Sequence, residues 1–187
     1  VERVTRAAVA ISEDDSLMHW RVVPLGTQIH PGYPETAVLV QGHDVLAVVR
    51  PPKGEGMTAL AALSHDSGRT FGPLVKTDLP MHDSKPFAGR LSDGRGYLIW
   101  NRGSPGRDTL WLGLTSPASL GPIRRVWRLV GGHPDALPTD MSHLGETAPA
   151  HEWAYPEAVE HDGVLSVVFS LNKRHCYLAQ VPLLSLD

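Results

Sequence analysis

Two distant stretches of the sequence repeat one pattern. Residues 153–170 read WAYPEAVEHDGVLSVVFS, and residues 32–50 read GYPETAVLVQGHDVLAVVR. Each begins with Tyr-Pro-Glu, continues as a short apolar segment, turns at Gly and Asp, and ends in a second apolar segment rich in valine. Gly and Asp supply the positive φ angles that hairpin turns need, and valine favours strands over helices. The repeat therefore predicts two equivalent antiparallel hairpins.

A third, weaker copy of the pattern reads SKPFAGRLSDGRGYLIWN at residues 84–101. A further pair of strands is expected after the copy at 32–50, beginning with TALAALS at 58–64. Another pair is expected after the copy at 84–101, beginning with TLWLGLT at 109–115. We find no amphipathic helical pattern in the sequence. Four antiparallel strands that recur at roughly fifty residues or more are typical of the blades of a β-propeller.

The blades can be counted along the chain. We expect a partial blade at about 1–28 and full blades at about 29–80, 81–130 and 151–187, with 129–152 as a loop between the last two. Propellers close with about four to eight blades, so these units cannot close a ring. We therefore expect an all-β, six-bladed β-propeller, of which this chain supplies about three and a half four-stranded antiparallel blades. An N-terminal half outside this sequence, or another chain, would supply the rest.

Composition narrows the classes of partner. The 187 residues carry 17 basic and 20 acidic side chains, so the near-neutral balance gives no reason to expect nucleic acid as a partner. No apolar run is long enough to span a bilayer, and no signal-peptide pattern is present. The ten histidines and the single Cys176 show no metal-ligand spacing, so we expect neither a metal nor a cofactor. One cysteine excludes an internal disulfide and leaves the compartment open.

The stretch SHDSGRTF, from Ser64 to Phe71, fits a known turn pattern. Ser64 and Asp66 can bond turn amides, Gly68 can take a left-handed angle, and Phe71 can fill the hydrophobic layer. Residues 12–20 hold a degraded version of the same pattern. The pattern resembles the Asp-box of sialidases and related propellers, a structural feature that is specific for the fold and not for an activity.

Strand parity predicts which residues share a face. The starts of the first strands and the ends of the second strands of successive blades lie on one face, close to the propeller axis. The Asp-box, which joins a third strand to a fourth, lies on the opposite face. The residues expected together near the axis are Tyr33, Glu35, Arg50, Lys85, Arg107 and Tyr155.

Over nearly the whole chain this arrangement resembles the C-terminal half of the sialidase (neuraminidase) superfamily. In that family a glutamate opens one blade and an arginine ends its second strand, as Glu35 and Arg50 do here. An arginine opens the third strand of the next blade, the place of Arg107, and a nucleophilic tyrosine opens the last blade, the place of Tyr155. The family's first arginine and its acid/base aspartate belong to the N-terminal half.

The resemblance implies an exo-acting glycoside hydrolase that removes a terminal sialic or related acidic sugar from a glycan. Tyr155 would be the catalytic nucleophile and Glu35 the base that activates it. Arg50 and Arg107 would bind the sugar carboxylate. A neutral phenol suits this substrate because a carboxylate nucleophile would be repelled by the acid group on the anomeric carbon, which is why sialidases depart from the two-carboxylate scheme. The further residues expected to line the substrate pocket are Tyr33 and Lys85.

Other interpretations stay open. Tyr155 can be an amphipathic pocket residue without a covalent role, and Glu157 can be structural or line the pocket. The loop 129–152 can shape a carbohydrate site or be a plain insertion. The whole domain can be a non-catalytic propeller that binds glycans or proteins, or a fragment with no activity of its own.

Overall fold

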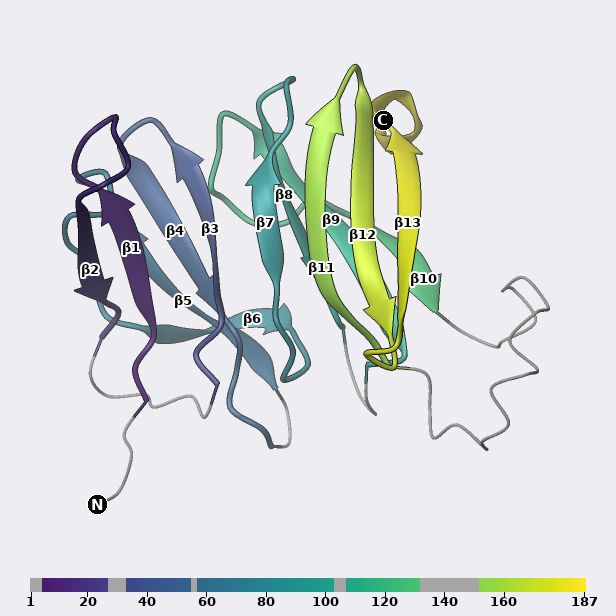
Figure 1. Cartoon of the computed structure of the whole chain (residues 1–187), viewed down its shortest axis with the longest axis horizontal. Helices are drawn as coiled ribbons and strands as arrows, with labels where there is room; N and C mark the ends of the chain where they lie inside the picture. The colour runs from purple at the N-terminus through teal and green to yellow at the C-terminus, as the bar shows by residue number, and fades with distance from the viewer. Residues whose placement is uncertain (1–4, 27–32, 55–56, 103–106, 132–151) are drawn as a thin grey trace.

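The computed structural model describes residues 5–26, 33–54, 57–102, 107–131 and 152–187. Within these ranges the chain forms thirteen strands and one short 3₁₀-helix, which confirms the expected all-β class. The strands form four antiparallel sheets, and in Figure 1 the sheets follow one another in chain order across the molecule.

Each sheet is an up-and-down arrangement of strands that are consecutive in the chain. The strands, grouped by sheet, are β1 (Ala8–Ser12) and β2 (Trp20–Pro24); β3 (Thr36–Gln41), β4 (Asp44–Val49), β5 (Thr58–Ser64) and β6 (Val75–Pro80); β7 (Phe87–Arg90), β8 (Arg95–Trp100), β9 (Thr109–Pro117) and β10 (Arg125–Gly131); and β11 (Trp153–His161), β12 (Val164–Leu171) and β13 (His175–Pro182), followed by the 3₁₀-helix (Leu183–Leu186).

The two Tyr-Pro-Glu copies form hairpins at equivalent places in their sheets. In the second sheet β3 pairs with β4 from Thr36–Val49 to Gln41–Asp44. In the fourth sheet β11 pairs with β12 up to His161–Val164. The turns contain Gly42 and Gly163, whose φ angles of 58° and 72° are those that the sequence pattern requires. The copies differ at their starts, because β11 begins before its Tyr-Pro-Glu, whereas β3 begins after it.

The last sheet departs from the four-stranded unit. The second and third sheets have four strands each, but the fourth has three among the described residues. After β13 the chain continues as the 3₁₀-helix. Most of the expected loop 129–152 lies outside the described residues, and β10 extends through its first positions to Gly131. The number of blades in the complete ring stays a prediction.

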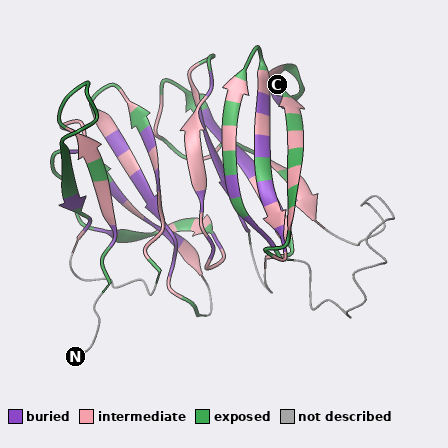
Figure 2. Cartoon of the chain, viewed as in Figure 1, coloured by how far each residue is buried: buried purple, intermediate pink, exposed green. Residues whose placement is uncertain are grey.

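The hydrophobic core lies between neighbouring sheets, as in a stack of propeller blades. One cluster, which includes Leu25 and Leu60, joins the first and second sheets. Another, around Trp100, joins the second and third. The largest, which includes Ile99 and Leu165, joins the third and fourth. Most residues of the central strands β4 and β8 are buried, whereas buried residues occupy every second position of β12, and half-buried and exposed residues alternate along β13 (Figure 2).

The first strands of three sheets lie next to one another. β3 contacts β7, and β7 contacts β11. These strands therefore line a shared inner side of the stack, while β6 and β10 form the outer edges of their sheets. This arrangement brings the beginnings of β3, β7 and β11, and the ends of β4, β8 and β12, to one end of the molecule.

The stretch SHDSGRTF forms the turn between β5 and β6. Ser64 Oγ accepts a hydrogen bond from the amide of Gly68 (2.8 Å) and donates one to Asp66 Oδ1 (2.8 Å). The amide and hydroxyl of Thr70 donate to the two oxygens of Asp66. Gly68 has φ +80°, and a Cβ there would approach Ile11 Cδ1 to 2.9 Å, so both the angle and the space favour glycine.

Candidate functional site

The site begins where β3 starts and β4 ends. The hairpin register places Glu35 opposite Arg50, whose amide donates to the Glu35 carbonyl (2.9 Å). Their side chains also meet, with Arg50 Nη1 2.6 Å from Glu35 Oε2. Asp66 lies at the other end of the same sheet, because β5 pairs Leu60 with Val49 and Ser64 with Val45.

Arg50 is enclosed on several sides. The residue is 7% exposed. Besides Glu35 it meets a second carboxylate, since its Nη2 is 3.7 Å from Asp83 Oδ2. Its guanidinium also lies 4.9 Å from the centroid of the Tyr33 ring, a cation–π distance. A buried cation requires such partners, so the two carboxylates explain how Arg50 is tolerated inside the protein.

The structure adds Asp83 and His82, which the sequence pattern did not single out. Nδ1 of His82 is 2.8 Å from Asp83 Oδ1, although the angle does not suit a hydrogen bond. Arg107 Nη2 donates to the backbone carbonyl of Asp83 at 3.0 Å. The signal that could have found Asp83 is its position just before Ser84 and Lys85, at the start of a first strand.

His82 stays neutral more readily than an ordinary histidine. Burial lowers its pKa, and this effect exceeds the opposing attraction of Asp83. The positive charges of Arg107 and Arg50 lower the pKa further, while Glu152 opposes them. Because a neutral imidazole carries one donor and one acceptor nitrogen, His82 adds a polar group to the site without adding a charge.

The third and fourth sheets are tied together at the same end. Arg107 stands just before β9, and its carbonyl accepts a hydrogen bond from the amide of Trp153 at 2.8 Å. The fully buried Asn101 donates to the carbonyls of Trp153 and Thr109, both at 2.8 Å. Its Oδ1 accepts from the hydroxyl of Ser84 at 2.5 Å. These bonds place the start of β11 relative to Arg107.

Tyr155 lies on β11 where the strand is irregular. The pairing with β12 shifts between Ala154 and Glu157, and Tyr155 has φ +55°. Its side chain is exposed. No hydrogen bond joins its hydroxyl to Glu35 in the described part of the chain, where the Glu35 carboxylate instead bonds Arg50. The structure thus brings Arg50 and Arg107 to Asp83 and Glu35 to Arg50, but it does not pair Tyr155 with its expected base.

Lys85 has an acidic partner across the inner strands. Its Nζ pairs with Oε1 of Glu157, joining the segment before β7 to β11. A cavity of about 230 Å³ lies beside this pair, between β3 and β7. It is lined by Thr36, Ala37, Val38, Lys85, Pro86, Phe87, Ala88 and Glu157. The charge of Lys85 is therefore balanced by Glu157 at the edge of this cavity.

The charges of the cluster balance. Glu35 and Asp83 are acidic, and Arg50 and Arg107 are basic. Arginine can bind a carboxylate through two parallel N–H groups. These four residues can therefore recognise an acidic ligand when a ligand oxygen replaces or joins the carboxylates of Glu35 and Asp83.

The described residues contain no group of three His, Cys, Asp or Glu side chains arranged to hold a metal ion. Among the described residues, no helix has the length and apolar character needed to cross a membrane.

Solved structures share this fold. A protein of unknown function from Dyadobacter fermentans is 22% identical, with a TM-score of 0.57 over 91% of this chain and 43% of that one. A mutant of the NanB sialidase from Streptococcus pneumoniae is 16% identical, with a TM-score of 0.60 over 92% and 26%. The Bacteroides ovatus xyloglucan PUL GH43B protein is 11% identical, with a TM-score of 0.55 over 94% and 34%. This chain spans less than half the length of each.

A comparison with curated protein sequences found no match. The family model of the BNR repeat-like domain matches residues 1–167, which is most of the chain. That match agrees with the Asp-box turn, with the four antiparallel sheets and with the sialidase among the similar structures. The chain therefore belongs to the family of BNR repeat-like domains.

Proposed function

We propose that this chain is the C-terminal part of a six-bladed propeller that acts as an exo-acting glycoside hydrolase of the sialidase type. Its substrate would be a glycan that ends in sialic acid or a related acidic sugar. The observation that carries the proposal is the meeting of Arg50 and Arg107 at one residue, Asp83. Two arginines from neighbouring sheets that converge at the axial end of the stack can bind one carboxylate.

The residue types give a balanced reaction. The Tyr155 oxygen attacks the anomeric carbon and passes its proton to Glu35, while the bond to the leaving oxygen breaks. That oxygen takes a proton from an acid in the N-terminal half, and water later hydrolyses the glycosyl-tyrosine bond. Tyrosine ordinarily has a pKa of about 10, so the phenol needs a base at neutral pH. Glu35 must therefore exchange part of its contact with Arg50 for the Tyr155 hydroxyl when substrate binds.

The proposal needs the residues that this chain lacks. The similar solved structures extend well beyond the part that this chain covers. In the proposed complete ring a third arginine and the acid/base aspartate come from the N-terminal half, or another chain completes the propeller. The activity belongs to that complete protein.

One observation favours a second candidate, a propeller that binds glycans or proteins without cleaving them. Glu35 is engaged with Arg50, and the described residues contain no hydrogen bond between Glu35 and Tyr155. A site with bound arginines and no activated nucleophile would recognise an acidic sugar and leave it intact.

The test uses the full-length protein, an aryl sialoside and an uncharged aryl glycoside. Tyr155→Phe should lower kcat by more than about a thousandfold and leave KM nearly unchanged, because the hydroxyl acts only in the bond-forming step. Arg107→Ala should raise KM for the sialoside roughly tenfold to a hundredfold, because it removes a charge-assisted contact.

Tyr33→Phe is the matched control, since it belongs to the other Tyr-Pro-Glu copy and keeps the ring over Arg50. It should retain nearly the native kcat. Native rates in Tyr155→Phe would exclude the covalent role and favour the binding propeller. An equal effect of Arg107→Ala on both glycosides would exclude carboxylate recognition by Arg107.

A further inference from the structure

Asp83 contacts both candidate arginines through two different groups. Its carboxylate Oδ2 is 3.7 Å from Nη2 of Arg50, which follows β4 in the second sheet. Its backbone carbonyl accepts a hydrogen bond of 3.0 Å from Nη2 of Arg107, which precedes β9 in the third sheet. Asp83 itself lies in the segment between β6 and β7. It therefore links the arginines of two neighbouring sheets.

The Asp83 carboxylate is not a solvated surface charge. Its side chain is only 14% exposed. Its second oxygen is 2.8 Å from Nδ1 of His82, and Arg50 is the cation on its other side. A carboxylate with so little access to water is stable only beside cationic or hydrogen-bonding groups. The charge of Arg50, at an ion-pair distance, thus helps to balance the charge of Asp83 inside the protein.

Arg50 needs this second partner because Glu35 reaches only one of its terminal nitrogens. Glu35 Oε2 contacts Nη1, and Asp83 Oδ2 contacts Nη2. Two anions on two nitrogens restrict rotation of the planar guanidinium, whereas one anion leaves rotation about the contact free. The ion pair with Asp83 therefore adds a second restraint on the orientation of the Arg50 guanidinium.

The contacts continue into the fourth sheet. The carbonyl of Arg107 accepts from the amide of Trp153 at 2.8 Å, two residues before Tyr155. A displacement of Asp83 would change the place of Arg107 and, through it, the first residues of β11.

We propose that Asp83 is a positioning residue that holds Arg50 and Arg107 at one separation, so that both can bind the same carboxylate of an acidic sugar. The inference rests on the proposed function for the identity of the ligand. The contacts that support it concern this chain's own residues, and they can be measured without any ligand.

The first experiment measures arginine order in the full-length protein labelled with ¹⁵N. The side-chain Nε–H signals of Arg50 and Arg107 report how firmly each guanidinium is held. Asp83→Asn should shift the Arg50 signal and speed its exchange with water. The Arg107 signal should change less, because asparagine keeps the backbone carbonyl. Asp83→Glu restores the charge and should partly recover the native Arg50 signal.

The matched control is Asp78→Asn, which removes an exposed carboxylate on β6. It should leave both arginine signals unchanged. Circular dichroism of each variant checks that the sheets are intact. An Arg50 signal that is the same in Asp83→Asn as in the native protein would overturn the inference, whatever the enzyme kinetics show.

The second experiment compares KM and kcat on the aryl sialoside and on the uncharged aryl glycoside. Asp83→Asn should raise KM for the sialoside on the order of tenfold, since misplaced binding groups lose much of their effect. The change in kcat should be smaller, and KM for the uncharged glycoside should stay the same. An equal rise on both glycosides, or a loss confined to kcat, would contradict the positioning role.

Failure of the proposed function is distinguishable from failure of this inference. If the native protein cleaves neither glycoside, the proposed activity is wrong, and the arginine signals alone decide the role of Asp83. If the native protein is active and Asp83→Asn changes neither KM nor the Arg50 signal, the activity stands and the inference is wrong.

Discussion

Some single residues in this protein have structural roles that the surrounding sequence does not predict. Asn101 follows β8 and is fully buried, yet all of its side-chain polar atoms have partners. Such an amide is stable inside a protein only when its donors and acceptor are all bonded. Its two donors join β9 to the start of β11, so one side chain connects the third and fourth sheets.

At the same scale, the turn carboxylate of Asp66 predicts a pH effect on stability. Hydrogen bonds from the amide and hydroxyl of Thr70, and from Ser64, lower its pKa from 3.8 to about 2. A carboxyl with a lowered folded-state pKa stabilises the fold above its unfolded pKa, and this stabilisation is lost as the pH falls through the folded pKa. Asp66→Asn should therefore lower the melting temperature near neutral pH, and its difference from the native protein should shrink between about pH 4 and pH 2.

Differential scanning calorimetry over this pH range checks the prediction. The exposed Asp78→Asn is a suitable control, because it should melt like the native protein near neutral pH. A difference between Asp66→Asn and the native protein that stays constant down to pH 2 would show that the ionised carboxylate does not stabilise this turn.

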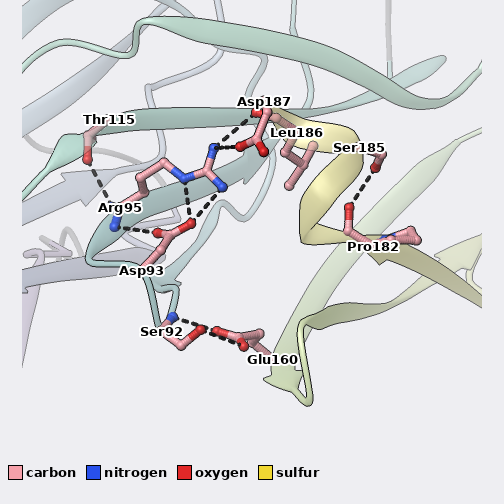
Figure 3. A network of polar contacts seen from close by, with 10 residues as sticks. Ser92, Asp93, Arg95, Thr115, Glu160, Pro182, Ser185, Leu186 and Asp187 are labelled. Atoms are coloured by element: carbon pink, nitrogen blue, oxygen red, sulfur yellow. Dashed lines mark hydrogen bonds and ion pairs between the residues drawn. The ribbon is translucent and has the colours of Figure 1, made fainter.

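At the scale of the elements, the sheets are tied at both ends. Opposite the candidate site, Arg95 at the start of β8 bonds Asp93 through Nε (2.7 Å) and reaches the carbonyl of Leu186 through Nη1 (3.0 Å). Figure 3 shows these contacts together with those from Ser92 to Glu160 on β11. The β7–β8 turn of the third sheet thus holds both the 3₁₀-helix and the end of β11.

Arg95→Ala should release the 3₁₀-helix and lower the free energy of unfolding by about 1.5–3 kcal/mol, the range for hydrogen bonds to charged groups. Arg95→Lys should have an intermediate effect, because it keeps the charge but loses the planar fork. Amide hydrogen exchange at Leu183–Leu186 and chemical denaturation measure the two consequences. Arg125→Ala, which removes an exposed arginine at the start of β10, is the control. Native exchange rates in Arg95→Ala would show that packing of Leu186 alone holds the helix.

At the scale of the whole molecule, both ends of the stack present apolar surface. On the first sheet Trp20 and Val22 are 54% and 66% exposed. On the fourth sheet Val159 and Leu178 are 64% and 60% exposed. Between neighbouring sheets, by contrast, apolar residues such as Leu60 and Leu165 are fully buried. Exposed apolar residues on both end faces are what a segment of a larger ring would present to its missing neighbours.

The isolated 187-residue chain should therefore associate in solution instead of remaining monomeric. Size-exclusion chromatography with light scattering measures its mass, and the full-length protein serves as the control. Trp20→Lys combined with Leu178→Lys should reduce association of the isolated chain, because it places charges on both end faces. A stable, monodisperse species of 20.3 kDa from the native sequence would count against the partial-propeller proposal.

Much of this fold could be predicted from the sequence because its determinants are local. Glycine at positive φ in a hairpin turn, alternating apolar residues and the Asp-box turn act within a few residues of one another. The all-β class, the hairpins at 32–50 and 153–170 and the four strands of the second and third sheets therefore followed from the residues alone. The three strands of the last sheet among the described residues did not, because no local pattern in β13 indicates whether another strand pairs with it.

The side-chain partners across sheets were decided by the tertiary structure. The sequence placed Glu35, Arg50 and Arg107 at one end of the molecule, since strand parity alone determines at which end a residue lies. The contact of Glu35 with Arg50 follows from the register of one hairpin. That Lys85 pairs with Glu157, and that Asp83 contacts both arginines, depends on how segments from different sheets approach one another. These approaches are set by packing between sheets, which brings together residues that no short stretch of the sequence contains.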